Sequence, residues 1–171
     1  MTPQVMACAC FVGSTSRVQT LDAVLIDTDA GTRGTPADFV ARFAELWSNP
    51  QLHAPVFGQL LGRRIRLVAP MTPTTTDRES GLHSLRKVFV AVPDLRASVL
   101  RWSQADDALF IEMRFTGTIG GRKVSWNNVD RFRFEGGVAV ERVAYFDPTV
   151  LQRALLRSPS GWVQLLRLFR G

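Results

Sequence analysis

The stretch formed by residues 124–148 constrains the fold of this chain more than any other. It reads VSWNNVDRFRF, then EGG, then VAVERVAYFDP, and β-branched and aromatic residues alternate with other types along both arms. Period-two alternation of this kind is typical of half-buried strands. Gly136-Gly137 stands between the arms, and glycine readily adopts the positive φ values of a two-residue turn. The stretch therefore predicts a β-hairpin.

The turn also sets the expected register of the two arms. If Glu135 lies opposite Val138, side chains that alternate with period two place one set of eight residues on a single face. The pairs are Phe132 with Glu141, Asp130 with Val143, Asn128 with Tyr145, and Trp126 with Asp147. We expect the other face to carry Arg142, Ala144 and Phe146.

Polar groups among aromatic rings predict a small-molecule site on the first face. A carboxylate in such surroundings is poorly solvated, and poor solvation raises carboxylate pKa values toward neutrality. Asp147 and Asp130 are the candidate catalytic residues, one acting as base and the other as proton donor. Tyr145 or Asn128 would donate a hydrogen bond to a developing enolate or alkoxide. The predicted ligand-binding residues are Trp126, Asn128, Tyr145, Phe132, Phe43 and Trp47.

A structural role is the alternative for the same residues. Asp130 precedes Arg131 and is near Arg142, so its role could be a salt bridge alone. Asp147 stands at a strand-to-helix junction, where Asp commonly caps the following turn. Trp126 and Tyr145 could be core residues with satisfied polar ends. An enclosed cavity of about 300 Å³ or more, with either aspartate at its wall, would favour an enzyme.

Size and charge fit one domain with an ordinary surface. The chain has 171 residues, of which 46% are hydrophobic and 21% charged, and no apolar run approaches the roughly 20 residues of a membrane span. The formal charge is +6, and the C-terminal part contributes four arginines, Arg153, Arg157, Arg167 and Arg170. These arginines could favour an anionic partner. Because no nucleic-acid motif accompanies them, we favour a solvated surface and expect no nucleic-acid partner.

Cysteine use and known motifs exclude several classes of protein. Cys8 and Cys10 are too close in sequence to pair without strain, so we expect no disulfide framework and a cytoplasmic location. The N-terminus lacks the pattern of a secretory signal. Phosphate-binding loops, dinucleotide fingerprints, zinc ligand sets and nucleophile elbows are missing. We therefore expect neither a metal nor a cofactor.

The chain divides into three parts. Residues 1–34 are rich in small and polar residues, and we expect a poorly ordered extension or at most an added edge strand. Residues 35–157 are expected to form an α+β domain. Residues 158–171 predict an amphipathic basic helix, and we favour a place across the mouth of the fold or against a second subunit over contact with a membrane surface.

Within the central part, the first helix is the clearest. Thr35 is a good N-cap and Pro36 suits the first helical position. An apolar face follows at helical spacing, formed by Phe39, Val40, Phe43, Leu46 and Trp47. A short strand is expected over 65–71 and a second helix over 77–90, with Thr76 and Glu79 as a capping box. Antiparallel strands over 96–104 and 109–118 precede the hairpin, and a helix over 149–157 follows it. The second of these strands alternates and places Leu109, Ile111, Met113 and Phe115 on one face.

This order of elements resembles the nuclear transport factor 2-like superfamily, in particular its bacterial SnoaL-like branch, over about residues 35–155. The resemblance is carried by Trp126, Val129-Asp130-Arg131-Phe132, Gly136-Gly137 and Tyr145-Phe146-Asp147-Pro148. It implies an α+β fold in which a cone-shaped, curved antiparallel sheet wraps around N-terminal helices, as in a cystatin-like roll. It also implies a pocket for a small hydrophobic molecule at the open end of the cone, and commonly a homodimer.

The resemblance implies several activities, because function is placed site by site on shared folds. Relatives include ketosteroid isomerases, polyketide cyclases, limonene epoxide hydrolases and non-catalytic binding domains. Asp147 matches the acid/base carboxylate of the cyclases, although the loop at 119–123 is shorter than theirs and lacks their histidine. The Tyr, Asn, Arg and two Asp residues of the epoxide hydrolases are not found at matching positions. The prediction is a SnoaL-like small-molecule-binding domain. It is either a cofactor-independent isomerase, cyclase or hydrolase using acid–base chemistry on an apolar ligand, or a non-catalytic ligand-binding or dimerisation module.

Overall fold

A computed structural model of the chain describes residues 34–157 and 162–163. The predicted extension at 1–34, except for its last residue, lies outside the described residues. So does nearly all of the predicted C-terminal helix at 158–171. No helix among the described residues is long and apolar enough to cross a membrane.

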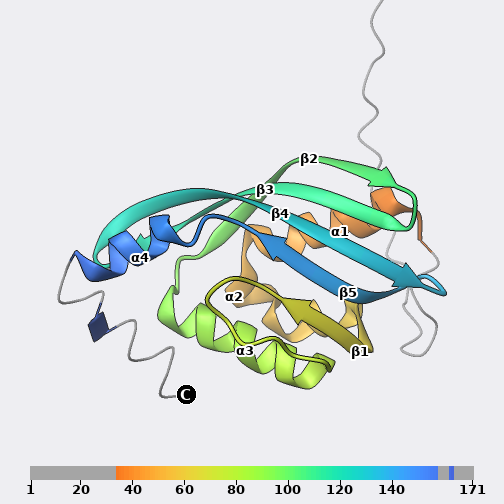
Figure 1. Ribbon diagram of the computed structural model, residues 1–171, viewed down its shortest axis with the longest axis horizontal. Helices are drawn as coiled ribbons and strands as arrows, with labels where there is room; N and C mark the ends of the chain where they lie inside the picture. Colours follow the sequence, from red (N-terminus) through yellow and green to blue (C-terminus); the bar gives the residue numbers. More distant parts are fainter. Residues whose placement is uncertain (1–33, 158–161, 164–171) are drawn as a thin grey trace, which may run out of the picture.

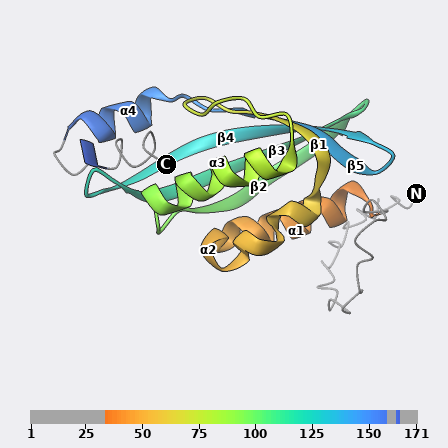
Figure 2. The same cartoon turned by 90° about the horizontal axis from the view of Figure 1, so that it is seen from below.

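The described residues form a five-stranded sheet with helices on one face (Figure 1). The elements are α1 (Pro36–Ser48), α2 (Pro50–His53), the 3-10 helix η1 (Ala54–Leu60), β1 (Leu61–Val68), α3 (Arg78–Ala91), β2 (Arg96–Ala105), β3 (Ala108–Ile119), β4 (Arg122–Glu135), β5 (Val138–Tyr145) and α4 (Thr149–Leu156). The strand order is β1-β5-β4-β3-β2. Figure 2 shows α1 and α2 beneath the curved sheet, α3 crossing in front of its strands in this view, and α4 at one end of it. The predicted α+β class is confirmed. The sheet is mixed, because β1 pairs with β5 in parallel.

The helix starts follow from side-chain caps. The Thr35 hydroxyl accepts a hydrogen bond from the Asp38 backbone N–H, and the Asp38 carboxylate accepts one from the Thr35 N–H, so the cap predicted for α1 is confirmed. The predicted cap of α3 is wrong by one residue. Asp77, not Thr76, is the N-cap, and its carboxylate accepts a 2.8 Å hydrogen bond from the Ser80 N–H. An aspartate is a strong acceptor at this position, which explains the preference.

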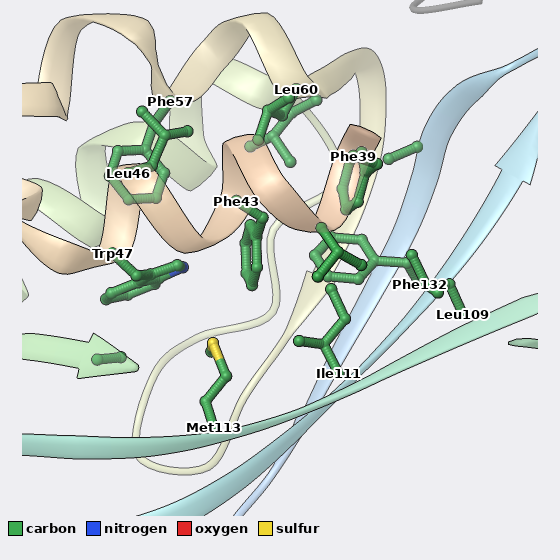
Figure 3. Packing of buried hydrophobic residues seen from close by; sticks show 14 of the residues in the cluster. Phe39, Phe43, Leu46, Trp47, Phe57, Leu60, Leu109, Ile111, Met113 and Phe132 are labelled. Carbon is green, nitrogen blue, oxygen red and sulfur yellow. The ribbon is translucent and has the colours of Figure 1, made fainter. Parts of the chain in front are cut away.

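An aromatic cluster fills the space between α1 and the sheet (Figure 3). The ring centroid of Phe132 on β4 lies 4.9 Å from that of Phe39 and 5.1 Å from that of Phe43. Trp47 lies 4.9 Å from Phe115 on β3. Each of these pairs meets edge to face, an arrangement worth about 0.5–1.5 kcal/mol beyond the area it buries. The inner faces predicted for α1 and β3 are confirmed, since these residues are buried.

The hairpin forms where predicted, but its register changes near the turn. Gly136 and Gly137 have φ values of 59° and 84°, and Glu135 lies opposite Val138 as predicted. Phe134 then lies opposite Ala139 and Arg133 opposite Glu141, which leaves Val140 as an extra residue. This is a β-bulge, and one extra residue moves every later side chain of its strand to the opposite face.

The predicted register beyond Val140 is therefore wrong. Phe132 lies opposite Arg142 and Asp130 opposite Ala144, in place of Glu141 and Val143. The concave face of the hairpin, toward the helices, carries Trp126, Asn128, Asp130, Phe132, Arg142 and Ala144. The polar set that was expected on one face is divided between two, and an arginine joins the inner one.

Candidate functional site

A cavity of about 200 Å³ lies between the concave face of the sheet and α3. Its wall is almost entirely apolar. It includes Phe43 and Trp47 of α1, Leu82, Leu85 and Val88 of α3, Phe115 and Trp126 of the sheet, Leu151 and Leu155 of α4, and the segment 67–73. Helices α1, α3 and α4, the sheet and the segment 67–73 thus surround a cavity that is partly open. Concave, mostly apolar spaces of this kind are where small molecules bind.

Two strongly polar side chains interrupt this wall. Arg142 is the one charged residue among the described residues that line the cavity, and Asn128 is the one carboxamide. Both project from the central strands of the sheet, where the bulge has turned Arg142 inward. The wall also includes the hydroxyl residues Thr72, Thr75 and Ser84, and Oγ1 of Thr75 is buried without a partner among the described residues. The cavity therefore has a mostly apolar body, and Arg142 and Asn128 form its polar end.

A buried ion pair holds Arg142 in place. Its Nη2 donates a 2.8 Å hydrogen bond to Oδ2 of Asp130, whose side chain is fully buried, while 17% of the Arg142 side chain is exposed. The guanidinium carbon lies 5.8 Å from the ring centroid of Phe43 and 5.6 Å from that of Trp47. A buried charge needs a partner. The carboxylate and the two aromatic faces together supply that partner.

Several polar atoms around this pair have no partner. Among the described residues no hydrogen bond reaches Nδ2 of Asn128, Oδ1 of Asp130, Nε of Arg142 or Nε1 of Trp47. Buried polar groups are normally satisfied, so each exception needs an explanation. Three of these four atoms are donors, and they belong to residues that line the cavity. A ligand that presents an acceptor at this end would satisfy them.

The structure brings half of the predicted site residues together. Phe43, Trp47, Trp126 and Asn128 line the cavity. Asp130 lies behind Arg142 and is not part of the wall. Phe132 is buried in the aromatic cluster under α1. Tyr145 follows the buried Ala144 on β5, points to the convex face and is 51% exposed.

Asp147 is also outside the cavity, at the start of α4. Its Oδ1 accepts a 2.9 Å hydrogen bond from the Thr149 N–H, and its Oδ2 accepts a 2.8 Å bond from the Thr149 hydroxyl. The backbone N–H first, and the hydroxyl second, hold the pKa of Asp147 below its ordinary value. Asp147 is exposed. Asp147 therefore stabilises the turn that leads into α4, as in the alternative given above, while the N-cap of the helix is Pro148.

The salt bridge of Asp130 with Arg142, given above as the alternative role of Asp130, is confirmed. Sequence reasoning placed Arg142 on the wrong face, however, and missed the walls formed by α3 and α4. One signal was available, because a carboxylate placed inward at Asp130 requires a cation within reach. Arg142 stands two residues before Ala144, so both must share a face. Placing Arg142 on the same face as Asp130 would have revealed the bulge.

The comparisons with known proteins agree with this architecture. A sequence model of the SnoaL-like domain family matches residues 40–142. The chain belongs to the SnoaL-like domain family. A comparison with curated protein sequences gives no significant match.

Solved structures similar to this SnoaL-like protein share its fold. A protein assigned as a SnoaL-like polyketide cyclase from Jannaschia sp. CCS1 is 16% identical with a TM-score of 0.65, over 80% of this chain and 100% of that one. A ketosteroid isomerase-like protein from Catenulispora acidiphila, in complex with trimethylamine, is 18% identical with a TM-score of 0.64, over 75% and 98%. An LEH-like epoxide hydrolase of M. tuberculosis is 19% identical with a TM-score of 0.57, over 77% and 94%.

Proposed function

We propose that this SnoaL-like protein binds a small, mostly apolar molecule that carries one hydrogen-bonding group. The observation that supports this most directly is the mostly apolar cavity of about 200 Å³, whose polar end contains unpartnered donors of Asn128 and Arg142. The aliphatic side chains of Leu82, Leu85 and Val88 would contact the apolar body of the ligand. Burial of that body would provide most of the affinity, at about 25 cal/mol per Å².

Acid–base catalysis is the second candidate, and one observation favours it. Asn128, Asp130 and Arg142 meet at the end of the cavity, and they include three of the residue types found in epoxide hydrolases. Oδ1 of Asp130 has no hydrogen-bond partner among the described residues, although it lies behind Arg142 and outside the cavity wall. The tyrosine and the second aspartate of that set do not join them.

Two observations place binding ahead of catalysis. The described residues of the cavity wall include no carboxylate, histidine, cysteine, lysine or tyrosine, so none of them is a general base. The volume of about 200 Å³ is below the value of about 300 Å³ that would favour an enzyme. Asp130 remains our proposed acid/base group if a reaction occurs. We do not propose Asp147, because it is exposed and its carboxylate accepts hydrogen bonds from Thr149.

A ligand screen tests both candidates. Thermal shift and native mass spectrometry with a library of neutral terpenoid, aromatic and epoxide compounds should give ligands that stabilise the protein. Asn128→Leu should lower the affinity for these ligands. Glu45→Gln, a substitution at an exposed position on α1, should leave the affinity unchanged. A library without any binder would refute the proposal. Turnover of a ligand that is lost in Asp130→Asn while binding persists would favour the enzyme.

Assembly and location form the rest of the proposal. The family resemblance supports a homodimer and a bacterial protein, and the spacing of Cys8 and Cys10 supports a cytoplasmic one. The boundaries of the domain at 35–157 are proposed on the same grounds. Light scattering on the purified full chain tests the homodimer, since a mass of one chain at micromolar concentration would contradict it.

A further inference from the structure

The ion pair at the polar end of the cavity leaves no net charge. Asp130 lies on the central strand β4, opposite Ile111 of β3 on one side and Ala144 of β5 on the other. Its side chain is fully buried, so its carboxylate cannot turn away into water. Its Oδ2 accepts from Nη2 of Arg142 at 2.8 Å. The positive charge that faces the cavity is therefore compensated from behind.

None of the elements around the cavity adds another charge among the described residues. Helix α1 contributes Phe43 and Trp47, α3 contributes leucines, valine, serine, glycine and alanine, and α4 contributes Leu151 and Leu155. The segment 67–73 adds apolar residues and one threonine. A charged ligand group would thus meet only a guanidinium that already has its counter-ion.

We propose that this cavity selects uncharged molecules and rejects carboxylates, because Asp130 is the built-in counter-ion of Arg142. This inference rests on the proposed ligand binding and names the class of ligand. Asp130 is here a positioning residue, which acts on the ligand through Arg142. The polar group of the ligand is an uncharged acceptor, such as a carboxamide, ketone or ester oxygen.

The physical reason is competition for one cation. A ligand carboxylate beside Arg142 would place two carboxylates on the same guanidinium, and like charges at such a distance prevent both from staying ionised. The surplus negative charge would lie in an apolar space, where an unpaired charge is strongly disfavoured. An uncharged oxygen instead accepts hydrogen bonds from Asn128 Nδ2 and Arg142 Nε, two donors without a partner among the described residues.

Matched acid and amide probes test this on the wild-type chain. We would measure the binding of cyclohexylacetic acid against cyclohexylacetamide, and of 1-naphthylacetic acid against its amide, by calorimetry at pH 7.5. Each amide should bind more tightly than its acid by about tenfold or more, the size expected for one like-charge contact. As the pH falls toward the carboxyl pKa of about 4–5, the acids should gain affinity and the amides should not.

Substitutions then test the part of Asp130. Asp130→Asn leaves Arg142 uncompensated and should reverse the preference, so that the acids bind more tightly at pH 7.5. Asp130→Asn combined with Arg142→Gln leaves no charge and should restore the preference for the amides. Glu45→Gln removes an exposed carboxylate on α1 and should change neither the affinity for the acids nor the affinity for the amides.

The outcomes distinguish a failure of the proposed selectivity from a failure of the proposed ligand binding. Wild-type protein that binds an acid as tightly as its amide at pH 7.5 would overturn the selectivity while ligand binding stands. Protein that binds neither member of either pair, and no neutral compound of the screen, would refute both. If Asp130→Asn does not fold, the selectivity of the wild-type protein and its dependence on pH test the inference. The double variant Asp130→Asn with Arg142→Gln is then the second test.

Discussion

The space under the sheet has two halves. Both are lined mostly by apolar residues, but one is filled by side chains and the other is hollow. Under α1 it is filled, because Phe39 and Phe43 meet Phe132 at 4.9 and 5.1 Å. Under α3 it is hollow, because Leu82 and Leu85 are only partly buried and line a cavity of about 200 Å³. Hydrophobic composition alone does not separate the two.

Ring size and helix approach account for the difference. Helix α1 places three aromatic rings on the sheet, and rings fill a wide gap. Helix α3 approaches the edge of the sheet closely at Gly81, where a Cβ would lie 2.3 Å from Cδ1 of Leu67. Its other inward residues are mostly aliphatic, and they leave the remaining width unfilled. A core and a binding cavity can thus share one sheet face, since the helices above it carry different side chains.

The largest expected effect tests the filled half. Phe132→Ala should lower the free energy of unfolding by about 3–5 kcal/mol, because its ring is fully enclosed and the hole cannot close. Leu85→Ala, in the hollow half, should cost less than about 2 kcal/mol, because its side chain already borders empty space. Urea denaturation measures both. Equal losses for the two variants would contradict the distinction between a filled and a hollow half.

The next effect concerns the pair at the polar end. Arg142→Gln should destabilise the protein by about 3 kcal/mol, because it leaves the Asp130 carboxylate buried without a cation. Asp130→Asn in the same chain should recover most of this loss, because it removes the unpaired charge. The measurement is a double-mutant cycle in urea. Losses that simply add would show that the two side chains do not act as a pair.

The fold could be predicted to the extent that its signals are local. The Thr35 cap, the inner face of α1, the alternation of β3 and the turn at Gly136 and Gly137 each depend on residues close in sequence, and all are confirmed. The parallel pairing of β1 with β5 depends on contacts between distant segments. No short pattern in the sequence encodes such a pairing.

The candidate site could be predicted only in part, because it depends on one irregular residue. The bulge at Val140 has no glycine or proline to mark it, yet it turns Arg142 inward and Tyr145 outward. Asn128 and Trp47 were predicted, since their strand and helix are regular. The cavity itself is the gap that α3 leaves against the sheet. Gaps between distant elements have no signature in a sequence.

A smaller effect on stability, with a large one on binding, tests whether the hollow half is the binding site. Leu85→Phe should fill part of the cavity and change the free energy of unfolding by about 1 kcal/mol or less, because the larger ring enters existing space. Ligands found in the screen should lose about tenfold or more in affinity. Leu52→Phe is the matched control, since Leu52 is 69% exposed. Unchanged affinity in Leu85→Phe would place the ligand elsewhere.

The smallest effect compares two carboxylates, one at each end of the space under the sheet. At the hollow end, the Thr118 hydroxyl and then its backbone N–H hold the pKa of Asp94 below its ordinary value of 3.8. At the filled end, the Thr35 hydroxyl and then its backbone N–H lower the pKa of Asp38. Each carboxylate therefore adds stability above pH 3.8, and this stability is lost as the pH falls through the lower folded-state pKa.

Asp94→Asn and Asp38→Asn should each be less stable than the wild type at pH 7, and each difference should shrink as the pH falls through the lowered folded-state pKa of the wild-type carboxyl. The two should differ in binding. Asp94 joins the loop before β2 to the end of β3, next to Leu95 and Ile119 of the cavity wall, so Asp94→Asn should also weaken ligands. Asp38 lies at the start of α1, away from the cavity, and its substitution should leave affinity unchanged. Unfolding at a series of pH values, with and without a ligand, measures both effects. Equal losses of affinity in the two variants would mean that the filled and hollow halves respond as one unit.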